Sequence, residues 1–199
     1  MGGKGIRMNY YQEITLFPNV DIGTYFIWQK LYQQIHLALV ESKSMENTSA
    51  IGVSFPEYDA GTFSLGTKLR LFADKEAALQ EMNCEKWLNR LNDYVQSDQI
   101  NPVPDRLTGY ACFRHVKLKG NKEKLARRRA KRIGETLQEA LQHFEGFKEQ
   151  CSKLPYINMK SQTNGQRFRL IIKKQVTNKP KIGFFSCYGL SNKTTVPLF

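Results

Sequence analysis

Three short segments of this chain hold side chains that could do acid–base or nucleophilic chemistry. His36 lies at the edge of an apolar helical stripe, and a histidine that titrates near neutral pH can take up or release a proton. Ser161 and Thr163 place two hydroxyls beside the turn pair Asn164-Gly165, and Tyr188 precedes a glycine near the C-terminus. Taken singly, none of these signals is specific, because a histidine there is often packed near the core and hydroxyls beside a turn often serve the turn itself.

The cysteines and histidines form no recognisable metal-binding pattern. Only three histidines occur, and none of the four cysteines belongs to a Cys-x-x-Cys pair. We therefore expect no metal, no cofactor and reduced thiols, as in a cytoplasmic protein. The cysteines are Cys84, Cys112, Cys151 and Cys187.

The charge of the chain lies almost entirely in its second half. Residues 1–106 carry 10 Lys and Arg against 13 Asp and Glu, whereas residues 107–199 carry 20 against 5. The run 114–132 alone holds ten basic residues and a single acid, Glu123. A local field of this strength attracts a polyanion, and nucleic acid is the leading candidate.

Two basic elements are expected to present this charge. A helix over residues 121–132 would carry Lys124, Arg128, Lys131 and Arg132 on one side, with Leu125 toward the core. A hairpin over residues 160–174 would carry Arg167 and Arg169 on one face and Phe168 on the other. A helix and a hairpin that merely face the solvent, without binding a polyanion, would show the same pattern.

Aromatic residues interleaved with the basic ones favour RNA over DNA, because unpaired bases stack on such rings. They are Phe113, Phe168, Phe184, Phe185 and Tyr188.

The elements of the first half alternate in the order β-α-β-β-α-β, which is the ferredoxin-like arrangement. The helix over residues 24–41 has apolar residues at helical spacing, and a second helix is expected to begin at an Asp74 N-cap and to continue to Val95. The four strands are expected at residues 9–17, 50–55, 68–72 and 100–103.

A proline- and glycine-containing stretch over residues 101–109 coincides with the change in charge and marks the expected domain boundary. We predict an α+β protein with a ferredoxin-like domain over residues 8–106 and a basic α/β domain over residues 107–199. Residues 1–7 are left out of the fold prediction, because Met8 is a candidate for the natural start and the residues before it could be native or an upstream or vector extension. The expected elements of the second domain are a strand at 110–118, helices at 121–132 and 135–149 separated by Gly134, the hairpin at 160–174 around a two-residue Asn164-Gly165 turn, and a strand at 182–188.

In their order and spacing, five separated strings resemble the CRISPR repeat-processing endoribonucleases of subtype I-F. They are IHLALV (35–40), IGVSFPEYD (51–59), LGTKLRLFA (65–73), SQTNGQRFRL (161–170) and SCYGLSN with VPLF (186–199). The resemblance implies a ferredoxin-like N-terminal domain and a C-terminal domain with an arginine-rich helix. It implies metal-independent cutting of pre-crRNA at the 3′ base of each repeat hairpin. It also implies that the protein stays bound to the crRNA hairpin and joins the other subunits of a crRNA-guided surveillance complex.

The resemblance also assigns roles to individual residues. It places the catalytic histidine at His36, a ribose-holding serine at Ser161, a second hydroxyl at Thr163 and a tyrosine that orients the histidine at Tyr188. It places a base-stacking aromatic at Phe168. The groove-facing basic residues fall on Arg128, Lys131 and Arg132, and Lys124, Gln162 and Arg167 are counted with the RNA-binding residues.

One departure from the family pattern affects base reading. The Arg-x-Gln pair on the linker strand falls on His115 and Lys117 without gaps, whereas a slip of one residue would use Arg114. Arg and Gln read guanine and adenine through paired hydrogen bonds, which His and Lys do not reproduce. An altered lower-stem preference is therefore expected.

Two alternatives remain open at this point. One is a non-catalytic RNA-hairpin scaffold in the same assembly, and the other is an unrelated ferredoxin-like RNA-binding or ribosome-associated protein. The presence of the histidine, the serine and the tyrosine favours the endoribonuclease.

Overall fold

The computed structural model describes residues 8–17, 22–42, 48–59, 65–118, 122–147 and 152–199. The chain forms two compact units: one contains the described residues up to His115 together with those from Pro155 onward, and the other spans Val116–Leu154. The second half of the chain thus contributes residues 107–115 and 155–199 to the first unit, so the compact units do not divide at the boundary predicted near residue 106. Among the helices of the described residues, none combines the length and the apolar composition that a membrane-spanning helix needs.

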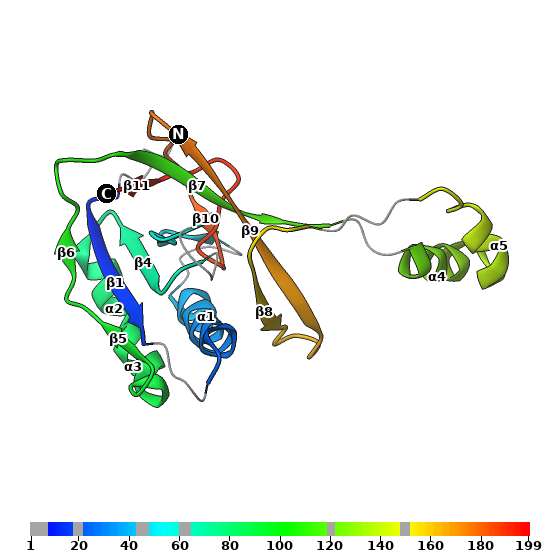
Figure 1. Cartoon of the computed structure of the whole chain (residues 1–199), viewed down its shortest axis with the longest axis horizontal. Helices are drawn as coiled ribbons and strands as arrows, with labels where there is room; N and C mark the ends of the chain where they lie inside the picture. Colours follow the sequence, from blue (N-terminus) through cyan, green and yellow to red (C-terminus); the bar gives the residue numbers. More distant parts are fainter. Residues whose placement is uncertain (1–7, 18–21, 43–47, 60–64, 119–121, 148–151) are drawn as a thin grey trace. The chain divides into compact units, whose positions relative to one another are not determined.

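The first unit is built on an antiparallel sheet in the order β3-β4-β1-β5, with β6 also paired to β1 (Figure 1). Its strands are β1 (Tyr10–Leu16), β3 (Gly52–Ser54), β4 (Lys68–Ala73), β5 (Val95–Ser97) and β6 (Asn101–Pro102). The central pair β1 and β4 runs from Tyr10 opposite Ala73 to Thr15 opposite Lys68. Helix α1 (Thr24–Glu41) has the predicted bounds and buries its apolar stripe against this sheet.

The second predicted helix of this half is wrong in its extent and in its cap. The segment divides into α2 (Glu76–Met82), α3 (Cys84–Leu88) and a 3₁₀ turn (Asn89–Leu91), while Val95 begins β5. Asn83 has φ of 44°, a left-handed conformation that ends α2, and its side chain then accepts from Lys86 N–H to cap α3. The N-cap of α2 is Lys75, not Asp74, and its side chain makes no capping hydrogen bond.

A second sheet of the same unit has the order β11-β7-β9-β8. It contains β7 (Gly109–Val116), β8 (Tyr156–Lys160), β9 (Arg167–Thr177) and β11 (Val196–Leu198). β8 and β9 form the predicted hairpin, with Lys160 opposite Arg167. The two-residue turn is wrong, because the loop spans residues 161–166: Gly165 N–H donates to Ser161 O, and Ser161 N–H donates to Gln166 O, each over 2.9 Å.

The strand predicted over residues 182–188 is much shorter than expected. Only β10 (Phe185–Ser186) forms, and it pairs with β2 (Thr48–Ser49). The following residues turn back, since Gly189 N–H donates to Ser186 O and Ser186 N–H donates to Leu190 O, both at 2.8 Å.

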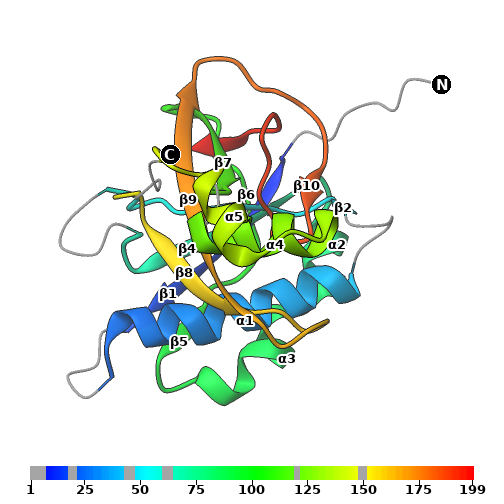
Figure 2. The same cartoon turned by 90° about the vertical axis from the view of Figure 1, so that its right-hand side faces the viewer.

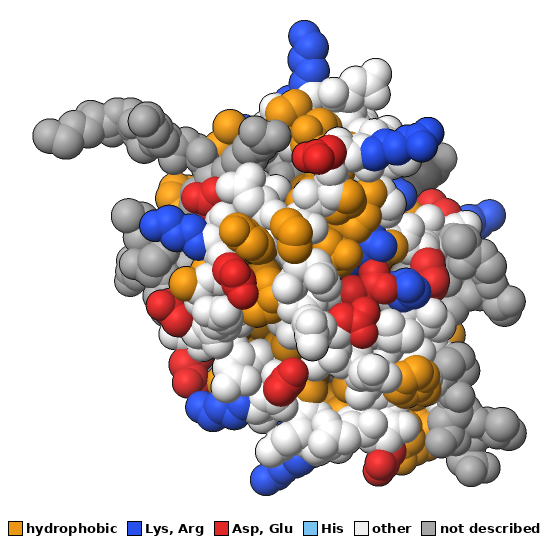
Figure 3. All heavy atoms as spheres, turned by 90° about the vertical axis from the view of Figure 1, so that its left-hand side faces the viewer, with side chains coloured by type: hydrophobic (Ala, Val, Ile, Leu, Met, Phe, Trp, Pro, Cys, Tyr) orange, Lys and Arg blue, Asp and Glu red, His pale blue; other side chains and the backbone are white. Residues whose placement is uncertain are grey.

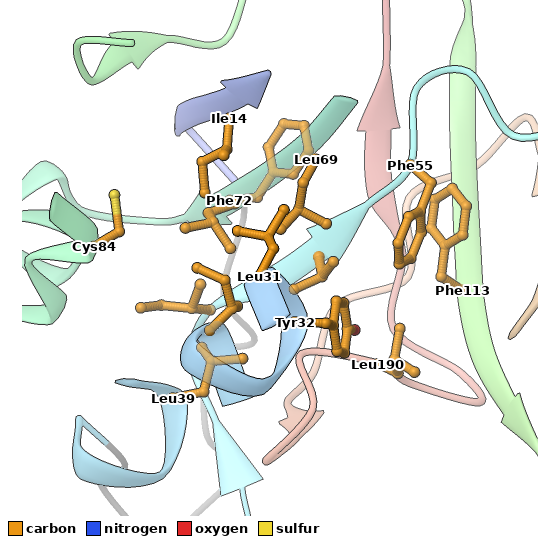
Figure 4. Packing of buried hydrophobic residues seen from close by; sticks show 14 of the residues in the cluster. Ile14, Leu31, Tyr32, Leu39, Phe55, Leu69, Phe72, Cys84, Phe113 and Leu190 are labelled. Atoms are coloured by element: carbon orange, nitrogen blue, oxygen red, sulfur yellow. The ribbon is translucent and has the colours of Figure 1, made fainter. Parts of the chain in front are cut away.

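The core of the first unit gathers side chains from both sheets around α1. Figure 4 shows Leu31 of α1 beside Leu69 and Phe72 of β4, and Tyr32 of α1 on the side of Phe55, Phe113 and Leu190. The ring of Tyr32 stacks on that of Phe55 at 5.9 Å, and Phe55 contacts the edge of Phe113 at 5.4 Å. α1 is central to this packing, because its buried side chains belong to one cluster with residues of both sheets.

The second unit is a pair of helices, α4 (Lys122–Ile133) and α5 (Leu137–Gln142). Gly134, with φ of 81°, ends α4 as predicted. Thr136 and Glu139 form a capping box at the start of α5. The predicted helix over residues 135–149 is therefore too long, and its last two residues lie outside the described residues. Taken together, the two units make an α+β protein with antiparallel sheets.

Candidate active site

His36 is held at the rim of α1 by the chain between Ser186 and Leu190. Its Nδ1 lies 2.9 Å from the carbonyl oxygen of Cys187. Because a carbonyl oxygen can only accept, Nδ1 donates the hydrogen of this bond. In the neutral ring, Nε2 therefore carries the lone pair and is the atom that can accept a proton.

The ring of Tyr188 lies flat against the imidazole of His36. The ring centroids are 4.2 Å apart and the planes differ by 9°. Phe168 of β9 meets Tyr188 edge-on at 6.3 Å. The structure thus brings together three of the side chains that the sequence singled out, from α1, β9 and the turn after β10.

Burial sets the protonation state of this site. It lowers the pKa of the half-buried His36 imidazole below its usual range, and the hydrogen bond to Cys187 offsets only part of this effect. Burial likewise raises the pKa of the Tyr188 phenol. The imidazole is accordingly neutral and the phenol protonated at neutral pH.

Tyr32 and Gly189 fix the turn that holds His36, and sequence reasoning missed the role of both. The hydroxyl of the fully buried Tyr32, one helical turn before His36, donates to Tyr188 O over 2.8 Å. Gly189 has φ of 69°, and a Cβ there would lie 2.3 Å from a methyl of Val53, so no other residue fits without movement. A tyrosine four residues before a histidine on the buried face of the helix was the available signal.

Ser161 and Thr163 lie in the loop between β8 and β9. Ser161 is half-buried and directly follows β8, while Gln162 and Thr163 are exposed. Among the described residues, no hydrogen bond joins either hydroxyl to His36. A hydrogen bond next to the loop connects it to the helix of His36: the N–H of Lys160, the last residue of β8, donates to Gln33 Oε1 of α1 over 3.2 Å.

The candidate RNA-binding residues of the first unit lie on β7 and β9. Arg167 is exposed at the start of β9, and Arg114 and His115 are half-buried near the end of β7. The Nε atom of Arg114 is buried and has no hydrogen-bond partner among the described residues. On the face shown in Figure 3, by contrast, acidic, basic and apolar side chains lie interspersed, so that face does not form a single-sign surface.

The second unit carries the arginine-rich helix and Lys117. Lys117, Lys124, Arg128, Lys131 and Arg132 are all exposed there. Two other arginines of α4 are neutralised within the unit, because Arg127 pairs with Glu123 and Arg129 with Glu135. Arg128, Lys131 and Arg132 have no acidic partner among the described residues, so their charge remains available to a polyanion.

The described residues contain no group of three or more His, Cys, Asp or Glu side chains placed to hold a metal ion. Cys84, Cys112 and Cys187 are free thiols, and Cys151 lies outside the described residues. Burial raises the pKa of the Cys84 thiol to about 11, so it stays protonated and unreactive.

Comparison with known proteins identifies the family of this chain. The family model described as CRISPR-associated protein (Cas_Csy4) matches residues 11–199. Two curated relatives carry the name CRISPR-associated endonuclease Cas6/Csy4. The protein of Escherichia coli (strain UTI89 / UPEC) is 32% identical over 193 residues, covering 96% of this chain and 100% of the relative. That of Pseudomonas aeruginosa (strain UCBPP-PA14) is 33% identical over 195 residues, with the same coverage. The resemblance inferred from the five strings is confirmed, and the chain belongs to the Cas_Csy4 family of CRISPR-associated proteins.

Proposed function

We propose that this protein is an endoribonuclease that cleaves CRISPR repeat hairpins in pre-crRNA without a metal ion. The 2′-hydroxyl of the RNA attacks the adjacent phosphate and leaves a 2′,3′-cyclic phosphate. The protein then stays bound to the 3′ hairpin of the crRNA as a subunit of a type I-F crRNA-guided complex. The endonuclease names of the two relatives and their full-length coverage support this proposal.

His36 is the general base in this proposal. Its Nδ1 is occupied by the Cys187 carbonyl, which leaves the lone pair of Nε2 to take the proton of the 2′-hydroxyl. The lowered pKa keeps this lone pair available at neutral pH. Tyr188 orients the imidazole by stacking, because rotation of the ring about its side-chain bonds would separate the two parallel faces.

Substrate positioning falls to the loop after β8 and to Phe168. The Ser161 hydroxyl holds the attacking ribose and Thr163 supplies a second hydroxyl, which raises the population of the in-line geometry. Phe168, half-buried beside Tyr188, stacks on the base at the cut. Gln162 and Arg167 contact the RNA next to the nucleotide at the cut.

Binding of the hairpin falls mainly to α4. Its exposed cations (Lys124, Arg128, Lys131 and Arg132) track phosphates along the stem. Arg114, His115 and Lys117 contact the lower stem, and the base preference there differs from that of an Arg-x-Gln pair. The strand order β3-β4-β1-β5 supports a ferredoxin-like arrangement for the domain that carries His36.

The observation that carries the proposal is the hydrogen bond from His36 to Cys187 under the stacked Tyr188 ring. The test is cleavage of a repeat hairpin RNA in the presence of EDTA by the native protein and by His36→Ala, with parallel binding measurements. We expect the native protein to cut, and the variant to bind equally well without cutting. If both proteins bind tightly and neither cuts, the protein is a hairpin-holding scaffold. If His36→Ala cuts at the native rate, His36 is not the base.

A further inference from the structure

Gln33 connects the helix that carries His36 to the loop that carries Ser161. It lies three residues before His36 on α1, and its Oε1 accepts the N–H of Lys160, the last residue of β8. Ser161 follows immediately. β8 and α1 are neighbours in the first unit, as both views of the chain show (Figures 1 and 2).

The orientation of the Gln33 side chain is fixed by this bond. Because the N–H of Lys160 is a donor, only the oxygen of the amide can face it. The Nε2 atom is therefore directed elsewhere, and it is buried without a hydrogen-bond partner among the described residues. An amide that is only half satisfied contributes less to folding than an apolar side chain of the same size, so stability alone does not account for a glutamine at this position.

The hydrogen bond between Lys160 and Gln33 restrains sliding of β8 along α1, which apolar packing alone restrains only weakly. β8 turns Ile157 and Met159 into the core, while Asn158 and Lys160 are exposed. Apolar contacts are non-directional and tolerate small sliding of a strand along a helix. A hydrogen bond from the last residue of the strand defines where the strand ends relative to α1, and hence where Ser161 lies relative to His36.

We propose that Gln33 is a positioning residue for cleavage, which holds the Ser161 loop in register with His36. The inference rests on the proposed function, because it assigns Ser161 to the ribose and His36 to the 2′-hydroxyl. In this role Gln33 acts through the Ser161 loop and not on the RNA itself. Its loss lets the loop drift, and a displacement of about 1 Å in such a site can slow a reaction about a hundredfold.

The test compares three variants of the full chain. Gln33→Met has nearly the same size but no acceptor, Gln33→Glu keeps an acceptor for Lys160 N–H, and Gln34→Met changes the same residue type one position along the helix. Cleavage is measured in single turnover at saturating protein on the alkaline plateau of the pH profile. Hairpin affinity, melting temperature and hydrogen exchange of the Lys160 amide are measured alongside.

We expect Gln33→Met to cleave at least about tenfold more slowly, with affinity within about twofold of native. Its melting temperature and the midpoint of its pH–rate profile should be unchanged, and the Lys160 amide should exchange faster. Gln33→Glu should recover most of the rate, and Gln34→Met should behave as native. A merely structural role would instead lower the melting temperature and leave the rate of the folded protein intact.

Native cleavage and native Lys160 exchange by Gln33→Met would overturn the inference while leaving the proposed function standing, provided that His36→Ala is inactive. Cleavage by His36→Ala at the native rate would overturn both the inference about Gln33 and the proposed function, because His36 would then not be the base that Gln33 aligns.

Discussion

The rings of His36 and Tyr188 lie nearly parallel, with their centroids 4.2 Å apart. The Nδ1 atom at the edge of the same imidazole is bonded to the carbonyl oxygen of Cys187, which lies 151 residues further along the chain. The imidazole is thus fixed by two successive residues of one turn, through a hydrogen bond and through a stacked face. A second hydrogen bond joins α1 to the same turn, because the hydroxyl of Tyr32 donates to the carbonyl oxygen of Tyr188. The helix and the turn therefore position each other.

The stacked ring of Tyr188, rather than its hydroxyl, should carry its contribution to cleavage. Tyr188→Phe keeps the ring and is expected to cleave within about threefold of native, since no hydrogen bond of the hydroxyl supports the imidazole among the described residues. Tyr188→Ala frees the imidazole to rotate and is expected to lose at least about tenfold. Single-turnover cleavage with matched affinity measurements checks this, and a larger loss for Phe than for Ala would contradict it.

The hydrogen bond from Tyr32 should contribute to both stability and rate. Tyr32→Phe leaves the Tyr188 carbonyl without its buried donor, at a cost of about 1–3 kcal/mol. For a chain of this size, that corresponds to a fall of very roughly 2–10 °C in melting temperature. Cleavage should slow while hairpin affinity is kept. Tyr10→Phe, which changes a half-buried tyrosine of β1 whose hydroxyl makes no hydrogen bond among the described residues, is the matched control and should leave both unchanged. An unchanged melting temperature for Tyr32→Phe would show that the bond contributes nothing.

The pH dependence of cleavage should reflect the lowered pKa of His36. The neutral imidazole is the active form, so the rate should fall as pH drops through this pKa. Because burial depresses the pKa, the fall occurs at lower pH than for an ordinary histidine, whose midpoint is about 6.5. The second-order rate constant is the quantity to follow, since it reports the free protein. An acid limb centred clearly above the ordinary value would contradict the assignment of His36 as a neutral base.

The unpaired cations of α4 should dominate the salt dependence of hairpin binding. Arg128→Ala, Lys131→Ala and Arg132→Ala should each weaken binding and reduce the slope of log affinity against log salt by about one unit. Arg127→Ala is the control, because Glu123 already neutralises that side chain, and it should change the slope much less. Titrations over a range of salt concentrations measure this. Equal slopes for all four variants and the native protein would remove this face of α4 from the binding site.

The sequence was most predictive where one local pattern decided the outcome. The apolar stripe of α1 defined both of its ends, and Gly134 correctly marked the end of α4. The helix predicted from Asp74 to Val95 was wrong because Asn83 adopts a left-handed conformation, which the apolar spacing around it does not reveal. The hairpin was correct but its turn was not, because the loop closes through the backbone of Ser161 and Gln166 instead of at Asn164-Gly165.

The site was predictable in its residue types and not in its connections. His36, Tyr188 and Phe168 were named from the sequence, and the structure brings them together. The bonds that hold them use backbone atoms, namely the carbonyls of Cys187 and Tyr188 and the N–H of Lys160. Every residue has these atoms, so their tertiary partners leave no mark in the residue types.

The central claim is that the RNA supplies its own nucleophile and that His36 activates it. It is tested most directly with a repeat hairpin that lacks only the 2′-hydroxyl of the nucleotide before the cut, compared with the all-ribose hairpin in EDTA. The account predicts that the native protein binds both equally, cuts only the all-ribose RNA and leaves a 2′,3′-cyclic phosphate on it. Cleavage of the 2′-deoxy hairpin would contradict the account, because the attacking group would then have to come from elsewhere.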